Sequence, residues 1–171
     1  MCNGPHIAEV AGKEPPVRPI GAGDRAAVAR FVADRWGAAV VVAHAAVFEP
    51  ATLEGFVAER DGRIAGLLTY ARDGDALEIV TLDADPPGAG TGTALVAAVA
   101  AAARTAGCRR LRLTTTNDNL DALRFYQRRG FRLVALRPGA VDAARALKPE
   151  IPVTGAHGIP LRDELDLERA L

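Results

Sequence analysis

The stretch from Asn119 to Phe131, N-L-D-A-L-R-F-Y-Q-R-R-G-F, constrains the fold of this chain more than any other segment. Asn119 is a residue type that caps the start of a helix, and Gly130 stands where a left-handed residue ends one. Between them, apolar residues recur at three- and four-residue spacing and so share one helical face: Ala122, Leu123, Phe125 and Tyr126. The stretch predicts a helix followed by a strand from 131 to 136. Tyr126 combines a ring that packs with a hydroxyl that stays available at a cleft.

A glycine-rich turn lies about 30 residues upstream, at Gly88-Ala89-Gly90-Thr91-Gly92-Thr93, and leads into an alanine-rich helix predicted for 91–105. The first N–H groups of a helix lack internal partners and carry partial positive charge, so a pyrophosphate that can come close is bound there. The hydroxyls of Thr91 and Thr93 can add hydrogen bonds. The turn matches neither a Walker motif nor a dinucleotide fingerprint. It is either a phosphate site or a flexible turn.

Turn residues and the alternation of apolar with polar residues predict the other strands and helices. Asp61-Gly62 is a two-residue hairpin turn between strands at 55–60 and 63–72, and a third strand at 76–83 completes an antiparallel meander. Alternation also predicts a strand at 109–115. The remaining expectations are strands at 17–20, 40–42 and 163–168, a helix capped by Asp24, and a short helix at 141–147. The pattern predicts a mixed α/β domain over residues 17–171, preceded by a flexible arm at residues 1–16.

Composition excludes several classes of protein. A chain of 171 residues with 49% hydrophobic and 25% charged residues is typical of one globular domain. The net charge of +0 argues against a nucleic-acid or anionic-membrane surface. Cys2 and Cys108 do not predict a structural disulfide, and Cys108 is expected to be a small buried residue. Because the sequence shows neither a long apolar run nor a signal-peptide pattern, we expect no membrane partner and a cytoplasmic location.

The two motifs together resemble the GNAT superfamily of acyl-CoA-dependent N-acetyltransferases. That family's acyl-CoA motif, Gln/Arg-x-x-Gly-x-Gly/Ala, falls on residues 87–92, and its second motif is matched by Asn119, Ala122, Phe125, Tyr126, Gly130 and Phe131. The order of predicted elements also fits the family. The resemblance implies a central mixed, mainly antiparallel sheet flanked by helices, with acetyl-CoA as cofactor.

The resemblance also implies roles for individual residues in direct acetyl transfer to a primary amine within a ternary complex. The backbone at Leu82, Asp83 and Ala84 would hold the pantetheine arm and polarise the thioester carbonyl. The pyrophosphate would lie on the glycine-rich turn, at Gly88, Ala89, Gly90, Thr91, Gly92 and Thr93. Asn119 would reach the cofactor, and Tyr126 would protonate the leaving thiolate or else be a core aromatic.

The residues that would handle the acceptor have weaker signals. Glu78 is a candidate general base or a solvated strand residue, and His44, Trp36 and His157 are candidate acceptor contacts or structural residues. The acidic residues between 163 and 168 either attract a cationic amine or form a solvated face. No histidine or cysteine spacing predicts a metal site.

One departure from the family pattern keeps an alternative open. Pro87 occupies the first position of the acyl-CoA motif, where it supplies neither a side-chain donor nor an N–H. This residue favours a non-catalytic acyl-CoA sensor, whereas Tyr126 and Asn119 favour an enzyme. A third reading, a nucleotide-binding protein, fits the turn less well. The expected partner is a small-molecule or peptide amine, and homodimerisation is common among proteins of this type.

Overall fold

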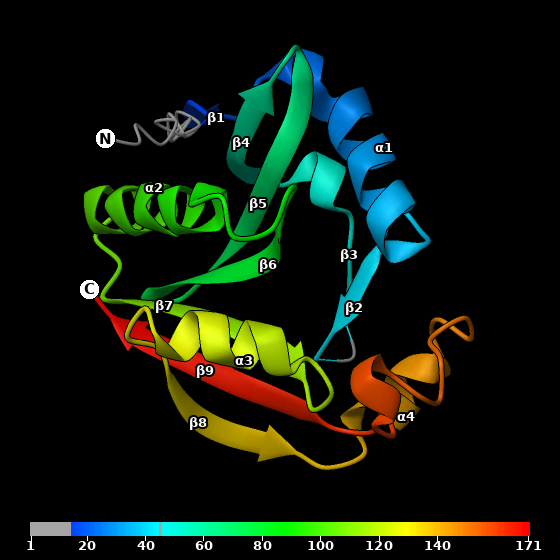
Figure 1. Ribbon diagram of the computed structural model, residues 1–171. Coiled ribbons are helices and arrows are strands. Elements are labelled where there is room, and N and C mark those ends of the chain that lie inside the picture. Colours follow the sequence, from blue (N-terminus) through cyan, green and yellow to red (C-terminus); the bar gives the residue numbers. More distant parts are fainter. Residues whose placement is uncertain (1–14, 45) are drawn as a thin grey trace, which may run out of the picture.

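The computed structural model describes residues 15–44 and 46–171, so the predicted arm at residues 1–16 lies outside the described residues except for its last two positions. Seven strands form one sheet in the order β1-β4-β5-β6-β7-β9-β8 (Figure 1). Only β6 and β7 pair in parallel, and the other neighbours are antiparallel. The strands are β1 (Val17–Pro19), β4 (Glu54–Arg60), β5 (Arg63–Asp73), β6 (Ala76–Ala84), β7 (Arg110–Thr116), β8 (Arg132–Arg137) and β9 (Glu164–Ala170).

Helices lie against both faces of this sheet. One hydrophobic cluster joins the sheet to α2 and α3, and a second joins it to α1 (Figure 1). A separate hairpin of two short strands follows α1. The bounds are α1 (Arg25–Trp36), α2 (Thr91–Thr105), α3 (Leu120–Gln127), α4 (Ala140–Arg145), β2 (Val41–Ala43), β3 (Ala46–Phe48), and the 3-10 turns η1 (Ala22–Asp24), η2 (Pro50–Thr52) and η3 (Ala156–Gly158). Within the described ranges, no helix is both long and apolar enough to cross a membrane.

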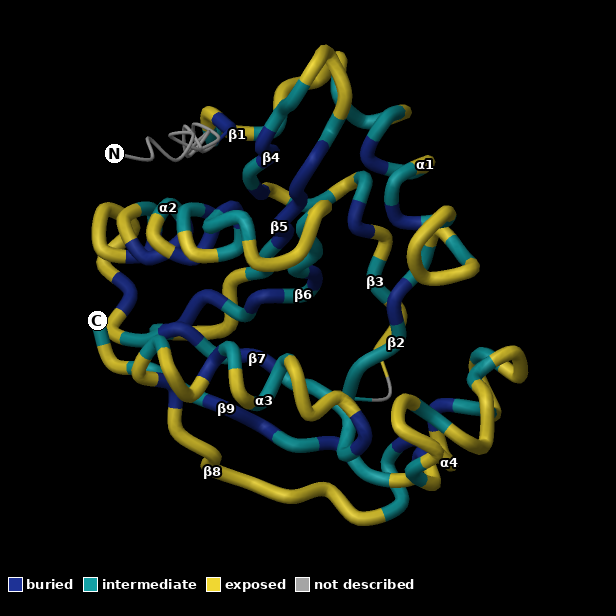
Figure 2. Tube along the Cα trace, in the orientation of Figure 1, coloured by how far each residue is buried: buried dark blue, intermediate teal, exposed yellow. Residues whose placement is uncertain are grey.

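The stretch from Asn119 to Phe131 folds as predicted. The side chain of Asn119 caps α3 by accepting the N–H of Ala122 at 3.1 Å, and Gly130 has the left-handed φ of +82°. Strand β8 follows this glycine as an edge strand that is exposed along its whole length (Figure 2). The conformational preferences of individual residues therefore determine where α3 begins and ends.

One prediction was wrong and one strand was not predicted. The side chain of Asp24 does not cap α1, because it accepts the N–H of Gly21 at 2.7 Å and pairs with Arg18 instead. The strand predicted at 40–42 forms as β2, but it pairs in a hairpin with a second short strand, β3, that was not predicted. Sequence reasoning missed β3 because three residues carry too little alternation to be read as a strand.

The parallel pair of β6 and β7 is short. The two strands pair only from Ala76 to Ile79 on β6, opposite 110–113 on β7. Directly afterwards β6 has a bulge, since Tyr70 of β5 pairs with Ile79 and Thr69 pairs with Thr81, which leaves Val80 without a partner. Beyond the bulge β6 stays with β5 while β7 continues beside β9, so β6 and β7 diverge (Figure 1).

A glycine in β5 sets the position of α2 relative to the sheet. A Cβ atom at Gly66 would lie 2.6 Å from the Cγ2 of Thr91 and 3.1 Å from the Cδ1 of Leu95. Both contacts come from the first turns of α2, so only glycine lets the helix start lie this close to β5.

We expect Gly66→Val to lower the free energy of unfolding by about 1–3 kcal/mol, because the added side chain overpacks the contact with α2. Gly23→Ala is the matched control, since a Cβ there meets nothing within 4 Å. Urea unfolding of both variants measures the difference. Equal stabilities would show that α2 does not depend on the glycine.

Candidate active site

The glycine-rich turn forms a cradle at the start of α2. Gly88 and Gly90 both have a φ of +85°, and a Cβ at Gly92 would lie 3.1 Å from the ring of Phe125. The N–H of Thr93 donates to the carbonyl of Gly90 at 2.8 Å, whereas the N–H groups before it in the first helical turn have no partner within the helix. The hydroxyl of Thr91 is buried and makes no hydrogen bond to the described part of the chain. This arrangement of free donors on a close backbone fits a pyrophosphate group.

Arg129 supplies a positive charge beside this cradle. Its Nε donates to the hydroxyl of Thr93 at 3.2 Å, and its Nη1 donates to the carbonyl of Phe125 at 2.8 Å. The guanidinium lies 3.5 Å from the centroid of the Phe125 ring. Burial, followed by the nearby charge of Arg128, lowers the pKa of Arg129. Sequence reasoning did not select this residue, although its position four residues after Phe125 places both on one helical face.

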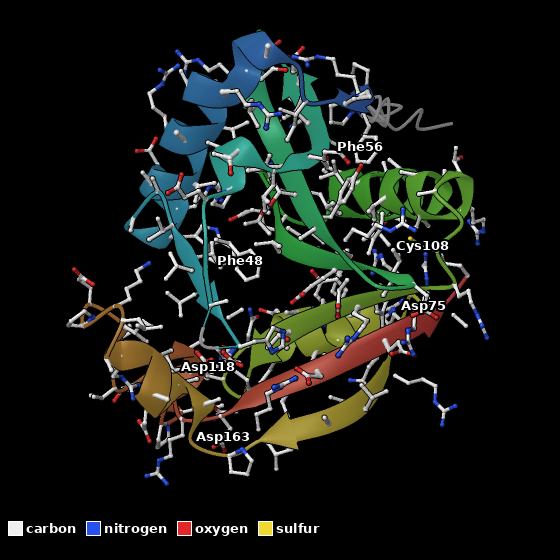
Figure 3. The ribbon with its side chains drawn as sticks, turned by 180° about the vertical axis from the view of Figure 1, so that it is seen from behind. Phe48, Phe56, Asp75, Cys108, Asp118 and Asp163 are labelled. Carbon is white, nitrogen blue, oxygen red and sulfur yellow. The ribbon has the colours of Figure 1, made fainter. Side chains whose placement is uncertain are left out.

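A pocket of about 140 Å³ lies where β6 and β7 diverge. Among the predicted site residues, Trp36, Glu78 and Asn119 line it. Leu77 and Ile79 pack in the cluster under α2, so Glu78 between them points to the other face of the sheet. The full lining is Trp36, Val41, Val42, Ala43, Phe48, Glu78, Ile79, Val80, Thr114, Thr115, Thr116, Asn119 and Glu164. Phe48 reaches the pocket from the β2–β3 hairpin (Figure 3).

His44 joins the hairpin to the sheet. It follows β2 with a φ of +51°, a conformation that non-glycine residues rarely adopt. Its Nε2 lies 2.8 Å from the Oε1 of Glu78 and 2.6 Å from the hydroxyl of Thr114. Its Nδ1 is buried and has no hydrogen bond among the described residues. The hydrogen bond with Glu78 is the main cause that raises the pKa of His44 above its usual 6.5.

The acidic residues of β9 extend this network. The hydroxyl of Thr114 donates to the Oδ1 of Asp166 at 2.8 Å, and the Nε of Arg137 donates to its Oδ2 at the same distance. Glu164, two residues earlier on the same face, is buried with a side chain that is 5% exposed. The prediction of a solvated face is therefore wrong for Glu164 and Asp166, because the alternation of side chains along the strand turns both residues inward.

Tyr126 lies in the hydrophobic core. Its ring makes edge contacts with Phe125 and Phe131, at centroid distances of 5.1 and 5.3 Å. The residue is 7% exposed, and burial raises the pKa of its phenol. Within the part of the chain that the structure describes, no hydrogen bond involves its hydroxyl. Cys108 is buried in the same core, as expected for a small packed residue.

His157 and Asp83 are among the predicted residues that do not line the pocket, and so is His44, which contacts the lining residue Glu78. His157 is exposed in η3, in a segment that Asp118 anchors by accepting the N–H of Ala156 at 2.7 Å (Figure 3). Its contact with an acceptor stays a prediction. The carboxylate of Asp83 pairs with Arg35 of α1 at 3.2 Å and its backbone lies opposite Leu67 of β5, so its contact with a cofactor also stays a prediction. Residues 15–44 and 46–171 contain no group of three or more metal-ligating side chains that could hold an ion.

Comparison with known proteins identifies the family. Residues 27–131 match the Acetyltransferase (GNAT) family. The chain is 43% identical over 136 residues to the uncharacterized protein YdhI of Bacillus subtilis, covering 79% of this chain and 85% of YdhI. It is 41% identical over 145 residues to the uncharacterized protein YxbD of the same organism, covering 84% and 91%. The chain belongs to the GNAT acetyltransferase family.

Solved structures confirm the predicted fold. A GNAT acetyltransferase from Elizabethkingia anophelis with acetyl-CoA bound superposes with a TM-score of 0.67 at 19% identity, covering 93% of this chain and 99% of that one. A Bacillus subtilis acetyltransferase in complex with CoA gives a TM-score of 0.66 at 18% identity, covering 92% and 99%. Both share the mixed, mainly antiparallel sheet flanked by helices.

We expect Glu78→Gln to lower stability more at pH 6 than at pH 9. A raised pKa means that the folded state favours the protonated imidazole. The resulting stabilisation is fully present below pH 6.5 and is lost as pH rises through the raised value. Chemical unfolding of the wild type and the variant at both pH values measures this. A difference that does not change with pH would contradict the pairing of His44 with Glu78.

Proposed function

We propose that this protein transfers an acetyl group from acetyl-CoA to a primary amine while both are bound. The observation that carries this proposal is the divergence of β6 and β7 at Val80. The cradle at the start of α2 belongs to one face of the sheet, and the pocket with Glu78 belongs to the other. A gap between the strands lets a cofactor held on one face meet an acceptor held on the other.

Bound acetyl-CoA would supply a thioester as the acetyl donor. Leu82 and Ala84 would hold its pantetheine arm through their backbone. The N–H of Asp85 bonds to the carbonyl of Ala65 in β5 at 2.8 Å, so the alternation of an antiparallel pair turns the N–H groups of Leu82 and Ala84 toward the gap. There they would polarise the thioester carbonyl, with the backbone of Asp83 completing the segment.

The pyrophosphate site would use the cradle at 88–93 together with Arg129. Pro87 contributes no cation and no N–H, and the guanidinium of Arg129 at Thr93 compensates for this loss. Thr91 contributes a buried hydroxyl that has no partner among the described residues. Asn119, which caps α3 and also lines the pocket, would reach the cofactor through the rest of its side chain.

Two groups would move protons. The hydrogen-bonded pair of His44 and Glu78 takes the proton from the acceptor's ammonium group. Tyr126 gives its phenolic proton to the leaving sulfur. Burial keeps the phenol protonated across the physiological range, and the same surroundings disfavour a free thiolate. The attacking nitrogen then gives its second proton back to the phenolate of Tyr126, so that one proton stays on the His44–Glu78 pair and the proton balance of the transfer is complete.

The size of the pocket favours a small acceptor. Pockets for drug-sized ligands usually measure about 300–1,000 Å³, whereas this one measures about 140 Å³. Solved structures with a similar fold include a ribosomal-protein-S18-alanine N-acetyltransferase from Escherichia coli and a nourseothricin acetyltransferase. The small volume supports a small-molecule amine over a protein chain. The proposal keeps the sequence-based expectations of a single domain over 17–171, a cytoplasmic location and no nucleic-acid or membrane partner. A homodimer is proposed only because it is common in this family.

Tyr126→Phe should lower turnover about 100-fold, since it removes only the proton donor, and should leave acetyl-CoA affinity little changed. Thiol release with a primary amine and calorimetric titration measure the two quantities. Tyr70→Phe is the matched control, because Tyr70 lies on β5, stacks on Phe56 and is not among the residues that line the pocket. Unchanged turnover in Tyr126→Phe would rule out its role as the acid.

Arg129→Leu should weaken acetyl-CoA binding about 10-fold, the loss expected for a charged hydrogen bond to phosphate. Arg128→Leu, an exposed neighbour on the same turn, should bind like the wild type. Calorimetric titration of both variants tests this. If acetyl-CoA affinity fell equally in both variants, Arg129 would act only through its charge and not through a direct hydrogen bond to the phosphate.

Pro87 favours one other candidate, a sensor that binds acyl-CoA without turnover. Acetyl-CoA binding with no thiol release in the presence of amines would support the sensor and contradict the transferase.

A further inference from the structure

Glu164 is a buried carboxylate whose charge has no dedicated partner. Its side chain is 5% exposed and lines the pocket. Its polar neighbours are both on His44, the backbone N–H at 3.4 Å and the Nδ1 at 3.9 Å from Oε2. Among the described residues, no arginine or lysine nitrogen lies within 4 Å of it. The imidazole of His44, which lies near it, is already hydrogen-bonded to Glu78, so Glu164 has no cation of its own among the described residues.

The neighbouring cations are already engaged. Arg137 stands opposite Glu164 in the pairing of β8 with β9, yet its guanidinium is directed to Asp166. The Nε2 of His44 faces Glu78 and Thr114. This wall of the site therefore carries three carboxylates, at Glu78, Asp166 and Glu164, and only the first two have a close side-chain partner.

The other walls fit an organic cation. Trp36 and Phe48 line the pocket, and aromatic faces attract ammonium groups. Val41 and Val42 add apolar surface to the pocket. Such walls do not supply the several oxygen ligands that a hard metal ion requires. Within the described ranges no set of side chains is arranged to hold a metal. A carboxylate facing aromatic and aliphatic walls suits an alkylammonium group.

We infer that the acceptor is a small aliphatic molecule with a second cationic group besides the amine that is acetylated. Glu164 binds the second cation, while the Glu78–His44 pair takes the proton from the reacting ammonium. The two carboxylates approach opposite nitrogens of the same imidazole, so the two cations of one short molecule reach both. This inference rests on the proposed acetyl transfer and adds the class of its substrate.

The test compares matched amines in an assay of thiol release from acetyl-CoA. Diaminobutane is paired with butylamine, and lysinamide with norleucinamide, so that each pair differs in one cationic group. We expect the wild type to use the dicationic member of at least one pair about 10- to 100-fold better in kcat/KM, mainly through a lower KM. Glu164→Gln keeps the shape of the side chain and should remove most of this selectivity.

Glu168→Gln is the matched control, because Glu168 lies on the same strand outside the pocket lining and should keep the selectivity. Thermal unfolding confirms that each variant is folded. Equal use of both members of each pair, or unchanged selectivity in Glu164→Gln, overturns the inference while the transferase stands. No thiol release with any of the four amines, despite acetyl-CoA binding, overturns the proposed transfer and the inference with it.

Discussion

The site depends on one local break in backbone hydrogen bonding, the bulge at Val80 in β6. The parallel pair of β6 and β7 stops at Ile79, and the strands then follow different neighbours. Backbone groups at Leu82 and Ala84 are left facing a gap, and unpaired groups away from water are costly unless a ligand or water satisfies them. The bulge thus provides both an opening between the two faces of the sheet and a row of donors along it.

The contacts around the gap divide the chemistry between the two faces. On one face, Gly66 lets the start of α2 lie close to β5, and Arg129 adds a cation there that Pro87 does not supply. On the other face, His44 connects the β2–β3 hairpin to β6 and β7 through Glu78 and Thr114. The hairpin supplies this histidine with a strained backbone, as is frequent for residues at functional sites.

Local sequence signals predicted most helices and strands. Features that depend on contacts between distant segments could not be predicted in this way. The Asn119 cap, the Gly130 terminator and the Asp61-Gly62 turn act within a few residues, so their residue types alone specify them. The bulge at Val80 is defined by its pairing with β5 and has no local signature. Likewise, Glu164 and Asp166 read as part of an acidic run until strand pairing turns them inward against His44, which lies about 120 residues away.

Hydrogen exchange of the full chain with and without acetyl-CoA tests the central claim most directly. We expect slower exchange for the amides of Leu82, Ala84 and residues 88–93, with little change in the exposed edge strand β8. Protection confined to the cradle would contradict the role of the gap between β6 and β7. Protection elsewhere, or none at saturating acetyl-CoA, would contradict the placement of the cofactor site altogether.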